Sequence, residues 1–284
     1  MLRRNLSVCL ILATATHFAT ACHSETIQLR TNQNSTIPIN QAVTSASATV
    51  NPTGESTRSI LEAQRVSFES VDGAIIVGTF YAAQAPDSSA VLLLHQWGSN
   101  RESFGALARQ LQTKGIAVMA IDGRGFGESI KRADGSKLTP SRTDEAVAGM
   151  KSDVQAAVQF LAHQANVKAD RIGILGASYG SSLAIIHAAQ NSTVKAAALL
   201  SPGINYFGNL PTEAAVKSYG ARPLLIVAAE DDAESATAAR SLNDLATGEK
   251  HQLQIYPKGG HGTDLLTAVV GLEKLLIEFF IANL

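Results

Sequence analysis

The residues with the clearest capacity for chemistry form the motif Gly176-Ala177-Ser178-Tyr179-Gly180. The motif follows an apolar run that predicts a strand, and it opens a segment that predicts a helix. A sharp turn of this kind strains the serine backbone and exposes its hydroxyl, while the flanking glycines avoid clashes with the neighbouring strand and helix. The helix N-terminus adds partial positive charge where a carbonyl oxygen would become negative. We therefore predict Ser178 as a nucleophile; the alternative is a glycine-rich turn with an incidental serine.

A nucleophilic serine needs a base, and the base needs a carboxylate that orients it. In strand–serine–helix sites the acid and then the histidine follow the serine along the chain. His261 is the only histidine after Ser178 that lies in a loop following a predicted strand. His187 lies within a predicted helix and His251 begins a predicted strand, so both are interpreted as surface or packing residues. His261 is therefore the predicted base.

Three consecutive acidic residues, Glu230, Asp231 and Asp232, are the candidates for the orienting carboxylate. They follow the apolar run Pro223–Ala229, which predicts a strand, so both the acids and His261 would follow strand ends. Each acid has an ordinary alternative role, either as a solvated turn residue or as the N-cap of the next helix. The residues alone leave the choice among the three open.

Apolar periodicity from residue 66 onward predicts strands that alternate with helices. Val66–Glu69 and Ala74–Phe80 flank Asp72-Gly73 and predict a β-hairpin. Further strands are predicted at Ala90–Leu94, Ile116–Ile121, Ile172–Leu175, Val194–Leu200, Pro223–Ala229 and His251–Tyr256. Helices are predicted at Arg101–Lys114, Glu145–Gln164, Ser181–Gln190, Ala233–Leu245 and Thr263–Leu284. This alternation is typical of an α/β protein with a mostly parallel sheet and helices on both faces, here with an antiparallel N-terminal hairpin.

Residues 66–284 resemble an α/β-hydrolase, close to the branch of dienelactone-hydrolase-like proteins and small serine esterases. Five stretches carry the resemblance in the family's order: LLLHQWGSN at 92–100, IDGRGFGES at 121–129, RIGILGASYG at 171–180, LLIVAAEDD at 224–232 and YPKGGHG at 256–262. The resemblance implies the α/β-hydrolase fold. The connection Ser201–Arg222 is too short for a large lid domain, so we expect an open site. Tyr206 and Phe207 in this connection either form walls of an acyl pocket or pack on the core.

The resemblance also implies roles for individual residues around the serine. The family's turn after the seventh strand reads Gly-Glu-x-Asp with the last Asp catalytic, and Ala229-Glu230-Asp231-Asp232 occupies that pattern. The resemblance therefore implies Asp232 as the acid, with Asp231 in reserve.

A second turn of the family, His-Gly-x after the third strand, supplies one N–H of an oxyanion hole. Here the turn reads His95-Gln96-Trp97-Gly98, so the resemblance implies Trp97 and Tyr179 as the two backbone donors. Gln96 stands where the family usually has glycine. True dienelactone hydrolases use cysteine as the nucleophile, so Ser178 is a departure that favours ordinary ester hydrolysis.

The implied function is that of a serine hydrolase, most closely a carboxylic ester hydrolase that acts on small soluble esters through a Ser-His-Asp acyl-enzyme mechanism. Thioesters, small amides and peptides are alternatives for the same three residues. A function of another class is also open, namely a tethered, catalytically silent lipoprotein whose fold only binds.

Composition and the remaining motifs exclude other classes of function. Lys plus Arg is 23 and Asp plus Glu is 24, and 45% of residues are hydrophobic, as in a soluble globular protein without a basic surplus for nucleic acid. Gly123-x-Gly125-x-Gly127 lacks the G-x-G-x-x-G spacing and the later acidic residue of a dinucleotide site. No Cys and His cluster has metal-ligand spacing. We therefore expect no cofactor, no metal and no obligate protein partner.

The first residues are interpreted as a targeting segment. Arg3 and Arg4 precede the apolar run Leu6–Ala15, and Ala19-Thr20-Ala21 is a cleavage signature, which predicts a signal peptide at 1–21. Cys22 comes directly after it, in a pattern that resembles a bacterial lipobox. We expect Cys22 to be lipidated, the alternative being a small residue near the cleavage site of a secreted protein.

The following residues, 22–65, are rich in Ser, Thr, Asn and Gln, which predicts a disordered tether ahead of a hydrolase domain at 66–284. The expected location is outside the cytoplasm, lipid-anchored in the bacterial cell envelope, or otherwise periplasmic or secreted. Membrane contact would be made through the N-terminal lipid alone.

Overall fold

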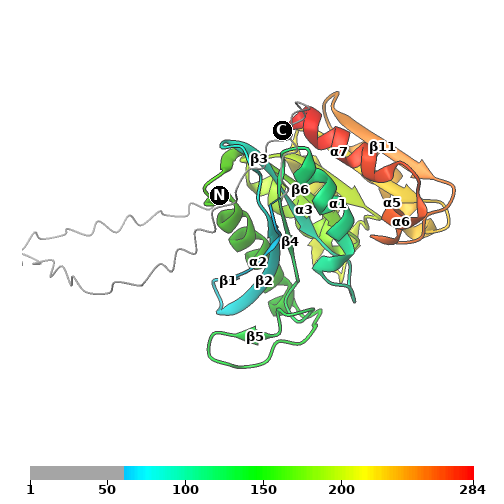
Figure 1. Cartoon of the computed structure of the whole chain (residues 1–284). Coiled ribbons are helices and arrows are strands. Elements are labelled where there is room, and N and C mark those ends of the chain that lie inside the picture. Colours follow the sequence, from blue (N-terminus) through cyan, green and yellow to red (C-terminus); the bar gives the residue numbers. More distant parts are fainter. Residues whose placement is uncertain (1–60) are drawn as a thin grey trace, which may run out of the picture. The chain divides into compact units, whose positions relative to one another are not determined.

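Continuous apolar runs form the centre of a nine-stranded sheet in residues 61–284, the part of the chain that the computed structural model describes (Figure 1). The predicted signal peptide, Cys22 and the tether up to residue 60 lie outside the described residues. The strand order is β1-β2-β4-β3-β6-β7-β10-β11, with β5 paired to β2. The strands are β1 (Gln64–Glu69), β2 (Ala74–Tyr81), β3 (Ser88–Leu94), β4 (Ala117–Ile121), β5 (Lys131–Arg132), β6 (Val167–Ala177), β7 (Val194–Leu200), β10 (Leu224–Ala229) and β11 (His251–Tyr256).

The register of the parallel strands brings their carboxyl ends to one edge of the sheet. Leu94 of β3 is level with Gly176 of β6, and Ala229 of β10 is level with Tyr256 of β11. The loops that follow these strands therefore meet at one rim. Strand β2 pairs antiparallel with β1, β4 and β5. All other pairs of the sheet, such as β3 with β4, are parallel. The predicted mostly parallel sheet with an antiparallel N-terminal hairpin is confirmed.

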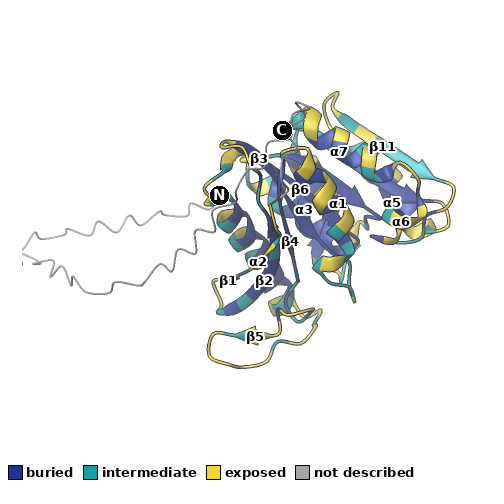
Figure 2. Cartoon of the chain, in the orientation of Figure 1, coloured by how far each residue is buried: buried dark blue, intermediate teal, exposed yellow. Residues whose placement is uncertain are grey.

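Helices cover both faces of the sheet (Figure 2). The strands alternate their side chains between two cores. In β3, Leu92 and Leu94 join the core beneath α2 to α5, whereas Val91 and Leu93 join the core beneath α1, α6 and α7. This alternation follows from the period of two in a strand. The helices are η1 (Arg101–Phe104), α1 (Gly105–Thr113), α2 (Asp144–Ala162), α3 (Tyr179–Gln190), α4 (Thr212–Tyr219), α5 (Ala233–Leu245), α6 (Asp264–Ala268) and α7 (Leu272–Asn283).

The predicted single helix over Thr263–Leu284 is wrong, because this segment forms two helices. α6 and α7 are separated at residues 269–271, where Gly271 has a φ of +89° that continues no right-handed helix. Leu265 of α6 and Leu272 of α7 are both fully buried in the same core. Each helix therefore buries an apolar side chain in that core on its own side of the break.

The short connection between β7 and β10 contains more structure than a loop. It forms a two-stranded hairpin of β8 (Asn205–Tyr206) and β9 (Leu210–Pro211), followed by α4. No large lid is present between these strands, as predicted. Within residues 61–284, no helix combines the length and apolar character that crossing a membrane requires.

Candidate active site

Ser178 lies at the turn between β6 and α3, in a backbone conformation that side chains rarely adopt. Its φ of +55° and ψ of −126° place the residue at the sharp turn that the motif predicts. A Cβ at Gly176 would lie 2.1 Å from the carbonyl oxygen of Gly180, and a Cβ at Gly180 would lie 2.6 Å from that of Leu94. Both glycines are therefore required by close approach of the backbone.

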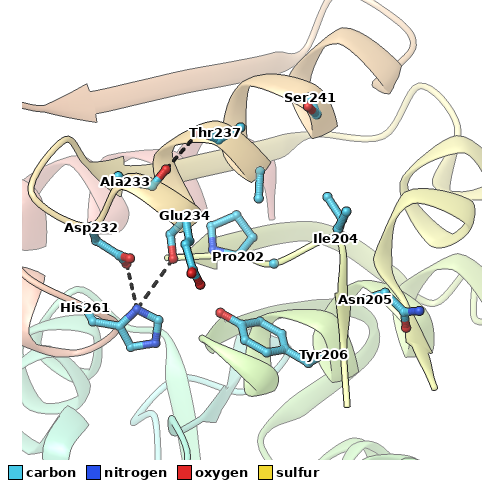
Figure 3. A pocket seen from close by; sticks show the side chains of 13 residues that line it. Pro202, Ile204, Asn205, Tyr206, Asp232, Ala233, Glu234, Thr237, Ser241 and His261 are labelled. Carbon is cyan, nitrogen blue, oxygen red and sulfur yellow. Dashed lines mark hydrogen bonds and ion pairs between the residues drawn. The ribbon is translucent and has the colours of Figure 1, made fainter. Parts of the chain in front are cut away.

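His261 connects Ser178 to a carboxylate across three loops of the rim. Its Nε2 lies 2.7 Å from Oγ of Ser178, and its Nδ1 lies 2.6 Å from Oδ2 of Asp232. Figure 3 shows Asp232 and the imidazole facing each other. With Nδ1 donating to the carboxylate, Nε2 is free to accept the serine proton.

The two neighbouring aspartates have different partners. Asp231 accepts hydrogen bonds from the backbone N–H groups of Gly259 and Gly260, at 3.1 Å each, so it holds the turn that leads to His261. Asp232 contacts the imidazole itself. Burial raises the pKa of Asp232, but hydrogen bonds from Ser235 and His261 outweigh burial, and the pKa lies below its ordinary value. The carboxylate is therefore ionised at neutral pH.

Ser235 and Ser201 support this arrangement, and the sequence reasoning missed both. Ser235 Oγ lies 3.5 Å from Nδ1 of His261, and its hydroxyl also bonds to Asp232. Ser235 lies in the first turn of α5, and nothing in the local sequence indicated that its hydroxyl would contact the acid. Ser201 Oγ accepts a hydrogen bond of 2.8 Å from the N–H of Gly262. A buried serine at a strand end carried no such signal either.

Gln96 ties the loop after β3 to the loop that carries His261. Its Oε1 accepts hydrogen bonds from the backbone N–H of Thr263 and, at 2.9 Å, from the Thr263 hydroxyl. The side chain thus makes contacts that a glycine at this position could not make. The adjacent His95 is a structural residue, since its Nδ1 lies 2.7 Å from the Gln96 carbonyl oxygen and its Nε2 accepts from the N–H of Gly123.

The backbone N–H groups of Trp97 and Tyr179 are positioned at the same rim as Ser178. Tyr179 is the first residue of α3, where an N–H has no acceptor within the helix. In the described part of the chain, the N–H of Trp97 donates to no other backbone group. Both residues line one cavity with Ser178. The oxyanion role predicted for the two N–H groups stays a prediction.

Two cavities border the site. One, of about 480 Å³, is lined by Trp97, Arg142, Ser178, Tyr179, Tyr206 and Phe207. The other, of about 720 Å³, lies between α5 and the segment 202–206 and reaches His261 and Asp232 (Figure 3). Tyr206 and Phe207, which line the smaller cavity, also pack against the larger core, as one of the two alternatives predicted.

Arg142 is a further cavity residue that the sequence reasoning missed. Its guanidinium lies 4.7 Å from the centre of the Trp97 ring and 5.0 Å from that of Phe207. These distances are those of cation–π contacts. Arg142 comes from the irregular loop between β5 and α2, and no periodicity in that loop indicated where its side chain would lie.

The glycine-rich turn after β4 packs so tightly against neighbouring residues that two of its glycines have no room for a side chain. A Cβ at Gly125 would lie 2.5 Å from the backbone of Thr139, and one at Gly127 would lie 2.2 Å from the carboxylate of Asp122. Within residues 61–284, no group of three or more His, Cys, Asp and Glu side chains is arranged to hold a metal ion.

The parallel sheet, the strained serine turn and the order of serine, aspartate and histidine along the chain are those of the α/β-hydrolase fold. Its family follows from the sequence profile of the Dienelactone hydrolase family, which matches residues 76–264. Because the match covers more than half of the chain, the chain belongs to this family.

Similar proteins extend this result. A dienelactone hydrolase from Anabaena variabilis superposes with a TM-score of 0.60 and 20% identity, covering 78% of this chain and 99% of that one. Acetyl xylan esterase 1 from Thermoanaerobacterium sp. superposes with a TM-score of 0.65 and 17% identity, covering 84% and 86%. At these identities the likeness shows the fold. The uncharacterized protein YfhR of Salmonella typhi is 29% identical over 123 residues, covering 42% of this chain and only 38% of that relative.

Proposed function

We propose that the protein is a serine esterase that hydrolyses small carboxylic esters through Ser178, His261 and Asp232. The observation that carries the proposal is the continuous chain of contacts from hydroxyl to imidazole to carboxylate, with distances of 2.7 and 2.6 Å. The ionised Asp232 holds the imidazole tautomer that accepts the serine proton, and it stabilises the imidazolium that forms.

The reaction proceeds in two steps, formation of an acyl-enzyme and its hydrolysis. Oγ of Ser178 attacks the ester carbonyl while its proton moves to Nε2 of His261, and the tetrahedral oxyanion is bound by the N–H groups of Trp97 and Tyr179. In acyl-transfer sites of this kind each donor contributes about 3 kcal/mol to stabilising the transition state. The carbon–oxygen bond to the alcohol then breaks, and His261 returns the proton to the leaving oxygen. Water repeats the sequence on the acyl-enzyme and releases the acid.

The similar structures support ester hydrolysis over a purely binding role. One is called a dienelactone hydrolase and another an acetyl xylan esterase, and both names describe cleavage of an ester bond. The complete set of three contacting side chains argues in the same direction, because a protein that only binds would need no base in contact with its serine. Thioesters remain compatible with the same chemistry.

A Ser178→Ala variant tests the proposal. We expect hydrolysis of p-nitrophenyl acetate to fall by at least about 1,000-fold, because removing the nucleophile leaves only binding and the oxyanion donors. The unsubstituted chain should be labelled covalently by a fluorophosphonate probe, and the variant should not. An active Ser178→Ala variant, or a fully folded chain that neither reacts with the probe nor hydrolyses esters, would contradict the proposal. Thioester and amide analogues of the same acyl group, measured in parallel, rank the bond types.

A further inference from the structure

The two cavities at the candidate active site contain different reacting groups. The cavity of about 480 Å³ contains Ser178 and the two residues whose N–H groups would bind the oxyanion. The cavity of about 720 Å³ contains His261 and Asp232 but is not lined by Ser178. Tyr206 lines both cavities. A substrate centred on the serine therefore has room to extend in two chemically distinct directions.

The proton transfer decides which half of an ester enters each cavity. His261 gives its proton to the departing alcohol oxygen, so the alcohol must leave on the imidazole side. The acyl carbon stays bonded to Ser178, with its oxygen at the N–H groups of Trp97 and Tyr179. We propose, building on the esterase function above, that the cavity of about 720 Å³ is the alcohol subsite and the cavity of about 480 Å³ is the acyl subsite.

The lining of the alcohol subsite indicates which alcohols it takes. Pro202, Ile204 and Ala238 give it apolar walls, and Ser241 and Asn205 add polar groups at the end away from His261 (Figure 3). Its carboxyl groups are those of Asp232 and Glu234, and its lining includes no Lys or Arg among the residues described. The subsite therefore favours a bulky neutral or cationic alcohol and disfavours an anionic one.

Two isomeric esters separate the two subsites. Benzyl acetate carries its ring on the alcohol and methyl phenylacetate carries it on the acyl group, while both alcohols are unactivated. Thr237 and Ser241 are one turn apart on α5 and both line the alcohol subsite. Thr237→Phe and Ser241→Phe should each lower kcat/KM for benzyl acetate by about tenfold or more, and change that for methyl phenylacetate by less than about twofold.

Thr267→Phe is the matched control. Thr237 and Thr267 are both exposed helical threonines whose hydroxyls bond to a backbone carbonyl, that of Ala233 at 2.8 Å and that of Asp264 at 3.0 Å. Thr267 does not line either cavity, so its variant should match the unsubstituted chain on both isomers.

Each other outcome overturns the assignment. Equal losses on both isomers would indicate a general structural effect, and a loss confined to methyl phenylacetate would reverse the subsites. No loss with either filling variant would show that the large cavity holds no part of the substrate. Absence of all Ser178-dependent ester hydrolysis would instead refute the proposed function itself.

The charge preference has its own readout. We expect 4-carboxybenzyl acetate to react about fivefold more slowly than benzyl acetate, because its carboxylate would face Glu234. Glu234→Gln should narrow this gap, measured as the ratio of kcat/KM for the two esters. Equal rates for the two esters with the unsubstituted chain would contradict the preference for neutral or cationic alcohols.

Discussion

Adjacent residues of one type can have separate tasks at a single site. Asp231 and Asp232 are consecutive, yet one bonds to the backbone of the turn before His261 and the other bonds to the imidazole. Both residues lie in the turn between β10 and α5, where Asp232 is the N-cap residue of α5. Asp231 therefore positions the loop, whereas Asp232 contacts His261, the proposed base.

Amide substitution at each aspartate separates these tasks. Asp232→Asn should lower kcat by about 1,000-fold or more with the fold retained, since an amide cannot stabilise the imidazolium. Asp231→Asn should lower kcat by less than about tenfold, because its amide oxygen still accepts a hydrogen bond from the turn. The measurement is steady-state ester hydrolysis with circular dichroism as a check of folding. Similar losses in the two variants would contradict the division of roles.

The pKa of Asp232 sets the pH range in which the Asp232→Asn variant should differ from the unsubstituted chain. Because its pKa lies below the ordinary value of 3.8, the carboxylate is ionised at every pH above that value. The stabilisation that it gives to the site is present above this pH and is lost as the pH falls below it. The kcat advantage over Asp232→Asn should therefore persist throughout the neutral range.

At the scale of elements, the site depends on how closely β3, β6 and α3 approach one another. The first turn of α3 packs directly on the end of β3, where a Cβ at Gly180 would lie 2.6 Å from one carbonyl oxygen and 2.7 Å from the next. This approach places the turn with Ser178 beside the loop with Trp97. Gly180 lies within a right-handed helix, so its backbone conformation does not require glycine. The close packing is what requires it.

Gly180→Ala tests this close packing. We expect the variant to lower the free energy of unfolding by about 2 kcal/mol or more, because its neighbours are backbone atoms that cannot move aside. Gly105→Ala is the control, since a Cβ there meets nothing within 4 Å and the backbone is helical. It should raise the free energy of unfolding by about 0.5 kcal/mol through helix propensity. Urea denaturation measures both, and equal effects would refute the packing argument.

At the scale of the whole molecule, helices on both faces bury titratable groups as well as apolar ones. His187, on α3, is half-buried, and burial lowers its pKa to about 4. Its Nε2 lies 3.2 Å from the side-chain amide of Asn191, a contact that suits a neutral imidazole. Unfolding would release the imidazole to water, where it binds a proton near pH 6.5.

This shift predicts a dependence of stability on pH. Neutral His187 contributes to the free energy of unfolding. This contribution is fully present above pH 6.5 and is lost as the pH falls towards 4, because the unfolded state then binds the extra proton. The loss between pH 7 and pH 5 should be about 2 kcal/mol. His187→Gln should remove this part of the slope in urea denaturation, whereas substitution of the exposed His163 by Gln should not. An unchanged slope in His187→Gln would show that the imidazole is accessible to protons in the fold.

Several features of the protein follow from local sequence alone. The alternation of short apolar runs with amphipathic segments predicted the mostly parallel sheet and its hairpin, because burial on one or both faces imposes a period on the residues that form each element. The turn around Ser178 was detectable for a similar reason, since only glycine is accommodated where the backbone approaches so closely. The break between α6 and α7 was missed because apolar periodicity continues across it.

The sequence by itself determined the sheet, its flanking helices and the group of residues from which a serine, a histidine and an acid could be drawn. Only the tertiary structure decided that Asp232 rather than Asp231 contacts His261, that Gln96 reaches Thr263, and that Arg142 and Tyr206 line a cavity with Ser178. The physical reason is that periodicity and turn chemistry act over a few neighbouring residues. Contacts between loops depend on strand register and on loop paths, which are set by the packing of the whole domain.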